Sequence, residues 1–188
     1  MRRLGKRILA GIAACCMVCT TMPEIPVWAD TEGTTYYVDQ DGGNDDASGT
    51  SEAEAWSSLD KINSVTFQPG DRILFQKGDV WTGQLSPKGS GEEGNPIVIG
   101  AYGEGDERPR IDGNNWCGED GDDLENRIFN SAVYFYNQEY WEITSLEVTN
   151  RIPGDNPDDH IKKYGILSWE RTRGHCAICT VRICMCMM

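Results

Sequence analysis

Hydrophobic residues come in short clusters along most of this chain. The segment TTYYVD, residues 34–39, has the β-branched and aromatic content of a strand, and Gly- and Asp-rich turn residues follow it. The segment RILFQKG predicts a second strand with Ile73 and Phe75 on one face, and a Pro-Gly-Asp turn at residues 69–71 precedes it. The pattern therefore predicts short strands joined by tight turns.

One segment between these strands has a helical period. Residues 52–63 predict a short amphipathic helix, and Ser51 with Glu54 fits a capping box at its start. The apolar residues of one face are Ala55, Trp56, Leu59 and Ile62. Two interpretations stay open: the helix covers the open end of a solenoid, or it is an ordinary packed helix of an α+β domain.

After residue 78 the apolar clusters are brief, and Gly, Asn or Asp ends each one. The clusters are TGQLSP, NPIVIGAYG, PRIDG, SAVYFYN, YWEITSLEVTN and YGILSW. Clusters of this length suit an all-β solenoid, in which each coil contributes one short strand to each sheet. The step of 23 residues from Ile143 to Ile166 is close to the length of one coil.

The first 29 residues have the features of a secretory signal peptide. Arg and Lys residues precede an apolar run over residues 8–18, which is too short to span a bilayer, and cleavage is predicted after Ala29. Acylation at Cys15 is the alternative, in which the protein is a lipoprotein. We expect a secreted protein without an integral membrane segment after signal removal.

Charge and cysteine content narrow the function classes. Residues 30–169 contain 28 Asp and Glu against 10 Lys and Arg, a net charge of −18. A nucleic-acid partner is excluded, because a polyanion needs a basic surface. An acidic polysaccharide would need a bridging divalent cation. Cys117 is the only cysteine in this segment, so it is not a disulfide scaffold.

Residues 34–167 resemble the opening of secreted right-handed parallel β-helix proteins of the pectate-lyase-like superfamily. The most specific parts are PGDRILFQKGDVW and GNPIVIGAYG, and AVYFYNQEYWEITSLEVTN is similar to a first full coil. The resemblance implies an all-β fold, a right-handed parallel β-helix, with residues 30–169 forming its N-terminal cap and first coils.

The resemblance implies a carbohydrate-active parent that is a polysaccharide lyase or a glycoside hydrolase acting on a polysaccharide, with calcium as a cofactor of the lyase type. In such enzymes the chemistry lies on middle coils, so no catalytic, cofactor-binding or metal-binding residue maps onto this chain. We expect the chain as given to be inactive. The alternative is a non-catalytic β-solenoid adhesin or glycan-binding surface protein.

Three features of the sequence are candidate sites. Residues 39–46 offer calcium-type oxygen ligands but lack the terminal bidentate Glu of a twelve-residue calcium loop, which favours a turn. The acidic segments 119–123 and 155–159 are interpreted as solvated turns. Six aromatic residues could stack on sugar rings, although interior packing is favoured for most of them: Trp81, Trp116, Tyr134, Tyr136, Tyr140 and Trp141.

The chain ends in HCAICTVRICMCMM, residues 175–188. Its cysteines and His175 suggest zinc or redox chemistry, but nothing after Cys186 could complete a zinc fold. Met has one codon and Cys has two, so the segment CMCMM nearly determines the DNA that encodes it. Read in a shifted frame, DNA compatible with residues 175–188 can encode a sequence typical of a further β-helix coil. The hypothesis is a frameshift near Ser168, with residues 170–188 as a non-native, out-of-frame and disordered tail.

Overall fold

The computed structural model describes residues 33–114, 131–150 and 164–169. All of them belong to the unit formed by residues 31–188. Their regular secondary structure is mostly β-strand with little helix, which confirms the all-β prediction. Among them, no helix is both long and apolar enough to cross a membrane.

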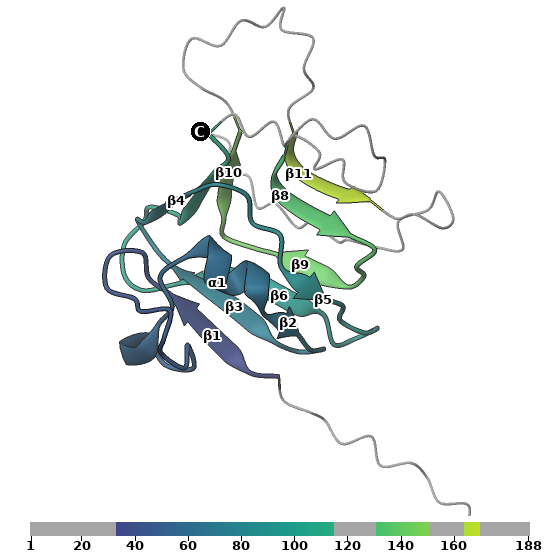
Figure 1. Ribbon diagram of the computed structural model, residues 1–188, viewed down its shortest axis with the longest axis horizontal. Helices are drawn as coiled ribbons and strands as arrows, with labels where there is room; N and C mark the ends of the chain where they lie inside the picture. The colour runs from purple at the N-terminus through teal and green to yellow at the C-terminus, as the bar shows by residue number, and fades with distance from the viewer. Residues whose placement is uncertain (1–32, 115–130, 151–163, 170–188) are drawn as a thin grey trace, which may run out of the picture. The chain divides into compact units, whose positions relative to one another are not determined.

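The largest sheet has four parallel strands in the order β1-β3-β6-β9 (Figure 1). Its members are β1 (Thr35–Val38), β3 (Arg72–Gln76), β6 (Ile97–Tyr102) and β9 (Trp141–Ile143). Ile73, Ile99 and Ile143 occupy one register row across β3, β6 and β9, and all three are buried. Ile73 and Phe75 lie on the same buried face, as the alternation in RILFQ predicts.

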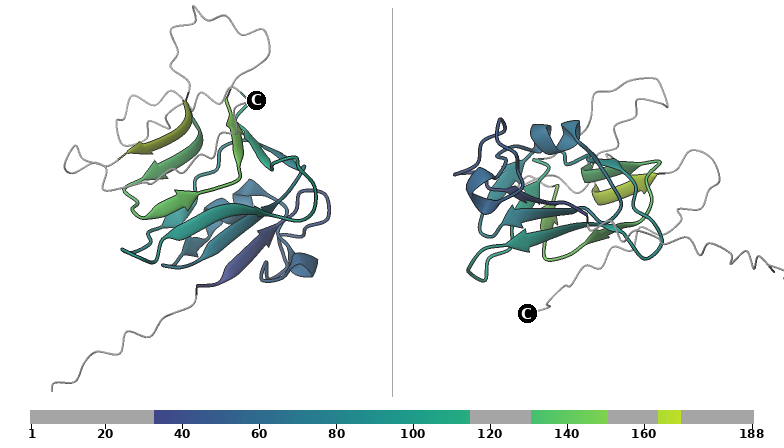
Figure 2. Two further views of the ribbon diagram at one scale, coloured as in Figure 1. Left: turned by 180° about the vertical axis from the view of Figure 1, so that it is seen from behind. Right: turned by 90° about the horizontal axis from the view of Figure 1, so that it is seen from below.

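Every pairing in the smaller sheets is also parallel. The second sheet has the order β10-β7-β4, from β4 (Val80–Thr82), β7 (Arg110–Asp112) and β10 (Glu147–Thr149). The third pairs β8 (Ser131–Tyr136) with β11 (Tyr164–Trp169). A fourth pairs β2 (Thr66–Phe67) with β5 (Lys88–Gly89). Figure 2 shows the strands from two further sides.

The three larger sheets recur in a fixed order along the chain. The first, second and third sheets are entered in turn by β6, β7 and β8, and again by β9, β10 and β11. Before them, β3 and β4 enter the first and second sheets, and Leu85 forms an isolated bridge with Val133 of β8 in the third. The predicted repeat from Ile143 to Ile166 is wrong in detail, because these residues lie in different sheets. Ile166 is in register with Val133, a step of 33 residues.

The helical segment is shorter than predicted. A 3-10 turn η1 spans Glu52–Glu54, and α1 spans Leu59–Ser64. The Ser51 side chain makes no capping hydrogen bond, so the capping box is wrong; Ser58 caps α1 instead by accepting from the Lys61 N–H at 3.1 Å.

Tertiary pairing explains this difference. The Trp56 N–H donates to the Tyr37 carbonyl and the Asp39 N–H donates to the Trp56 carbonyl, while the Tyr37 N–H donates to the Gly49 carbonyl. Gly49 and Trp56 are thus bonded to the backbone of β1 on either side of the 3-10 turn η1, and this pairing overrides helix propensity at Trp56. The same bonds close the outer edge of β1, which an unprotected parallel sheet would leave open.

The predicted apolar face is nevertheless buried, and it joins one core with the sheets. Trp56, Trp81 and Trp141 are the largest aromatic members, and their indole N–H groups donate to backbone carbonyls at 3.0, 2.9 and 3.1 Å. Burying an Ile or Phe side chain contributes about 1.5–3 kcal/mol relative to exposure, so this core is the main source of stability.

Asn63 ties α1 to the chain that follows β4. Its amide nitrogen donates to the Gln84 carbonyl at 2.9 Å, and its amide oxygen accepts from the Ser86 N–H at 2.7 Å. One side chain therefore satisfies two backbone groups of a neighbouring extended segment.

Candidate functional site

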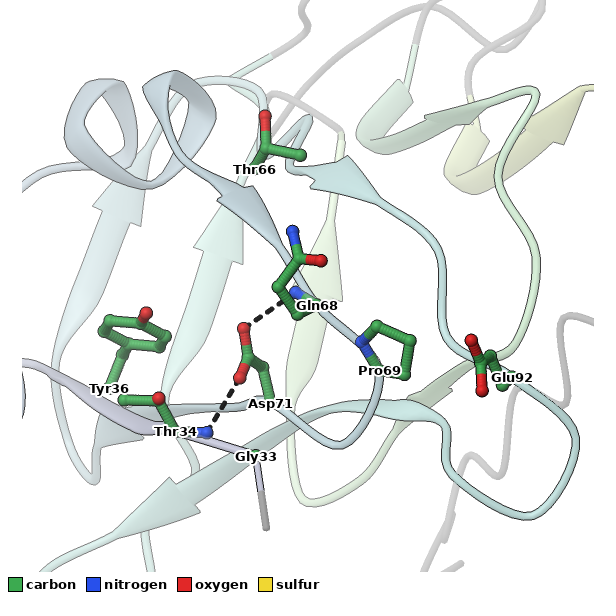
Figure 3. A pocket seen from close by; sticks show the side chains of 8 residues that line it. All are labelled: Gly33, Thr34, Tyr36, Thr66, Gln68, Pro69, Asp71 and Glu92. Atoms are coloured by element: carbon green, nitrogen blue, oxygen red, sulfur yellow. Dashed lines mark hydrogen bonds between the residues drawn. The ribbon is translucent and has the colours of Figure 1, made fainter. Parts of the chain in front are cut away.

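A cavity of about 420 Å³ opens beside the start of β1 (Figure 3). Three parts of the chain line it: the start of β1, the segment from β2 to β3, and the turn after β5. The lining residues are Gly33, Thr34, Tyr36, Thr66, Gln68, Pro69, Asp71 and Glu92. Its volume is at the small end of the range of roughly 300–1,000 Å³ that small-molecule sites occupy.

Asp71 is the buried charged residue of this cavity. One carboxylate oxygen accepts the Thr34 N–H and the other accepts the Gln68 N–H, both at 2.8 Å (Figure 3). The Asp71 N–H also donates to the Gln68 carbonyl across a turn with Pro69 second and Gly70, at φ 86°, third, which are the residues a type II turn requires. Because both oxygens are used, Asp71 holds two walls together.

Tyr36 is fixed by aromatic neighbours. Trp56 stacks on its ring with centroids 4.8 Å apart, and Phe67 approaches edge-on at 5.4 Å. In Figure 3, Tyr36 and Glu92 lie on opposite sides of Asp71. The tyrosine is therefore positioned by the core before any ligand arrives.

The rim of the cavity carries polar groups without protein partners. Within the described part of the chain, the side chains of Thr66, Gln68 and Glu92 are exposed and make no hydrogen bond or ion pair. An amide, a hydroxyl and a carboxylate together can both donate and accept hydrogen bonds. Among the described residues that line the cavity there is no Lys or Arg, so they offer no cation with which to hold an anionic group.

Sequence reasoning interpreted residues 69–71 only as a turn and missed this cavity. Its walls come from three segments that the fold brings together, and no local motif marks them. The one signal available was a Pro-Gly-Asp turn placed directly before a predicted strand.

The candidate calcium segment, residues 39–46, forms a turn in which the Asp39 and Asp45 carboxylates accept hydrogen bonds from backbone N–H groups. Asp39 Oδ1 accepts from the N–H groups of Asp41 and Gly42 at 3.0 and 2.7 Å. Asp45 Oδ1 accepts from the N–H groups of Ser57 and Ser58 at 2.8 and 3.0 Å, and its Oδ2 accepts from the Ser58 hydroxyl. Among the residues that the structure places, no group of three or more His, Cys, Asp or Glu side chains could hold a metal.

Two carboxyls near this turn have shifted pKa values of opposite sign. Burial by itself raises the pKa of Asp45, but its hydrogen bonds from Ser58 and Ser57 outweigh burial and leave that pKa below 3.8. Burial also raises the pKa of Asp79, and the charges of Asp39 and Asp41 raise it further, against a hydrogen bond from the Gln40 N–H. The folded protein therefore favours the ionised form of Asp45 and disfavours the ionised form of Asp79.

The aromatic candidates separate into two groups. Trp81 and Trp141 are buried, which confirms interior packing for both. Tyr134 and Tyr136 are half-buried on β8, with ring centroids 6.4 Å apart, and Tyr140 is half-buried at φ 56°. The other candidates lie outside the described residues: Trp116, the acidic segments 119–123 and 155–159, the predicted signal peptide at residues 1–29, and residues 170–188 with His175 and their cysteines.

Comparisons with known proteins point to glycan-active enzymes. No family model matches the chain. The lacto-N-biosidase of Bifidobacterium longum subsp. longum is 33% identical over 134 residues, which cover 64% of this chain and 8% of that protein.

Solved structures give the same result. A GH136 lacto-N-biosidase from Eubacterium ramulus, as its selenomethionine derivative, matches with a TM-score of 0.56 and 28% identity over 72% of this chain and 24% of that chain. The native form matches with a TM-score of 0.53 and 27% identity, over 71% and 23%. This chain therefore spans a quarter or less of the length of these relatives.

The fold and these similarities define the class: the chain is related to a segment of a carbohydrate-active enzyme, a glycoside hydrolase. The particular proteins that it resembles are lacto-N-biosidases, of which the Eubacterium ramulus enzyme is a GH136 member. The expectation of a carbohydrate-active relative is confirmed at this level.

Proposed function

We propose that residues 30–169 are the N-terminal cap and first coils of a right-handed parallel β-helix in a secreted glycoside hydrolase. The observation that carries this proposal is the recurrence of three parallel sheets in a fixed chain order. Parallel strands of one sheet need crossover connections, and such connections are right-handed in nearly all proteins. The closed outer edge of β1 supports its place as the first layer of the stack.

The proposed activity of the whole protein is that of a lacto-N-biosidase, with a lacto-N-biose-containing glycan as substrate. The similarity to enzymes of that name supports a hydrolase over a polysaccharide lyase. Hydrolysis of a glycosidic bond needs two suitably spaced carboxyl groups. In the cavity, Asp71 has both oxygens engaged by backbone N–H groups, so we assign the chemistry to coils beyond the described ones and expect the chain as given to be inactive.

The remaining parts of the proposal concern the two ends of the chain. Residues 1–29 are a signal peptide that directs secretion, and residues 170–188 are the product of a shifted reading frame near Ser168. The abrupt change to Cys- and Met-rich sequence supports the second statement. Calcium stays a proposal for the full-length parent, as a cofactor of the lyase type.

The test compares two polypeptides from the same gene: the chain as printed, and the product with the frame restored near Ser168. Both are assayed for release of lacto-N-biose from a chromogenic lacto-N-bioside. We expect turnover only from the restored product. A restored frame that meets an early stop codon refutes the frameshift, and glycan binding without turnover would favour the adhesin alternative.

A further inference from the structure

We infer that the cavity beside Asp71 is an accessory binding site for a neutral sugar unit of a glycan. This inference rests on the proposed function for its ligand class, a carbohydrate. It concerns a place in the N-terminal cap that the catalytic chemistry does not use.

The walls of the cavity are rigid before binding. Asp71 joins the start of β1 to the turn before β3 through two 2.8 Å hydrogen bonds, and Trp56 and Phe67 fix the ring of Tyr36. A ligand therefore does not have to order these walls, and the entropic cost of binding is reduced.

The polar groups at the rim suit hydroxyl groups of a sugar. The Gln68 amide and the Thr66 hydroxyl each donate and accept, and the Glu92 carboxylate accepts. None of the three has a protein partner among the described residues, so a sugar hydroxyl displaces only water. The Tyr36 ring adds an apolar surface of the kind that sugars contact.

Charge selects against acidic sugars. Asp71 and Glu92 both line the cavity, and none of its lining residues in the described part of the chain is a Lys or Arg. A uronate carboxylate would meet two like charges with no cation to offset them. Galactose and galacturonate differ by this one carboxylate, so they form a matched pair of probes.

The experiment is a titration of the isotope-labelled full chain with galactose and, separately, galacturonate, followed through backbone amide NMR shifts. We expect galactose to shift the amides of residues 33–36 and 66–71, and galacturonate to bind several-fold more weakly. Glu92→Gln should narrow the difference between the two sugars. Galacturonate binding as tightly as galactose, or galactose shifting amides only elsewhere, would overturn the inference. Binding of a simple amine in preference to galactose would overturn it in favour of a cation site.

Two glutamines provide the matched variants. Gln68 and Gln40 are both exposed, and the backbone N–H of each donates to an Asp carboxylate, of Asp71 and Asp79 respectively. Replacing either side chain by Ala leaves that backbone bond in place. We expect Gln68→Ala to raise the galactose Kd roughly three- to tenfold, the effect of one lost hydrogen bond, and Gln40→Ala to leave it unchanged. Equal effects of the two variants would contradict the assignment.

The hydrolysis assay separates this inference from the proposed function. Hydrolysis by the frame-restored protein together with silent cavity amides would refute the sugar site alone. Galactose binding in the cavity together with no hydrolysis by the restored protein would refute the proposed activity alone.

Discussion

Replacing Asp71 by Asn should destabilise the protein much more than the same replacement at Asp45. Each oxygen of Asp71 accepts one backbone N–H, from Thr34 and from Gln68, at 2.8 Å. An asparagine keeps one of these bonds and turns its NH2 group toward the other N–H, where two donors then face each other. The lost charge-assisted bond is worth about 1.5–3 kcal/mol, and the partly buried donor left unsatisfied adds up to about 1 kcal/mol, the low end of the usual cost.

At Asp45 the same substitution leaves the essential bonds in place. Both backbone N–H groups donate to one oxygen, Oδ1, and the other oxygen, Oδ2, accepts from the Ser58 hydroxyl. An asparagine can keep its carbonyl on the two N–H groups and donate its NH2 to that hydroxyl, which then reverses its role. We expect a loss below about 1 kcal/mol, because no backbone group loses its partner.

The measurement is the thermal unfolding midpoint at pH 7, followed by tryptophan fluorescence. A loss of about 3 kcal/mol at Asp71 corresponds to a decrease of roughly 6–12 °C, at about 2–4 °C per kcal/mol for a domain of this size. Faster hydrogen exchange at the Thr34 and Gln68 amides should accompany it. The reasoning is refuted if Asp45→Asn lowers the midpoint as much as Asp71→Asn does.

Three further predictions concern single side chains. Ser58→Ala should lower the free energy of unfolding, measured in urea, by about 1 kcal/mol, the usual effect of a lost N-cap. Ser51→Ala should leave this free energy unchanged, because the Ser51 side chain makes no capping hydrogen bond. Asn63→Ala should cost about 1–3 kcal/mol for two lost backbone contacts, and Asn44→Ala, with one exposed local bond, should cost clearly less. Asp79→Asn should raise the thermal unfolding midpoint at pH 7, because the raised pKa means that the folded state disfavours the ionised carboxyl. This gain should disappear below pH 3.8, where the Asp79 carboxyl is protonated in both the folded and the unfolded protein.

The sequence predicted the strands well, because their signal is local. Alternation places Ile73 and Phe75 inside, and the Pro-Gly-Asp turn at residues 69–71 has the chemistry of the turn that forms. The clusters PRIDG and SAVYFYN contain β7 and β8. The cluster YWEITSLEVTN forms two strands, β9 and β10, because Ser145 adopts φ 56° between them.

The sequence predicted the helix and the site less well, because long-range pairing decides both. Ser51 and Glu54 satisfy the local rule for a capping box, but backbone bonds from Tyr37 and Asp39 hold the following residues extended. The cavity depends on Asp71 meeting the Thr34 N–H, which is 37 residues away. A single sequence contains no local signal for such a meeting.

The two outer edges of the described sheets differ in how their backbone groups are paired. The outer edge of β1 is closed by the backbone of residues 49–56, and α1 adds Leu59 and Ile62 to the core beside it. β9, β10 and β11 each form the last strand of their sheet in the described residues. The bonds from Thr144 to Ile99 and from Glu147 to Pro109 place alternate groups of β9 and β10 against the preceding layer. In a parallel sheet, alternate residues of a strand bond to opposite neighbours, so the N–H and C=O groups of Ile143 and Val148 point away from β6 and β7. A further parallel strand beside β9 or β10 would form hydrogen bonds with these groups.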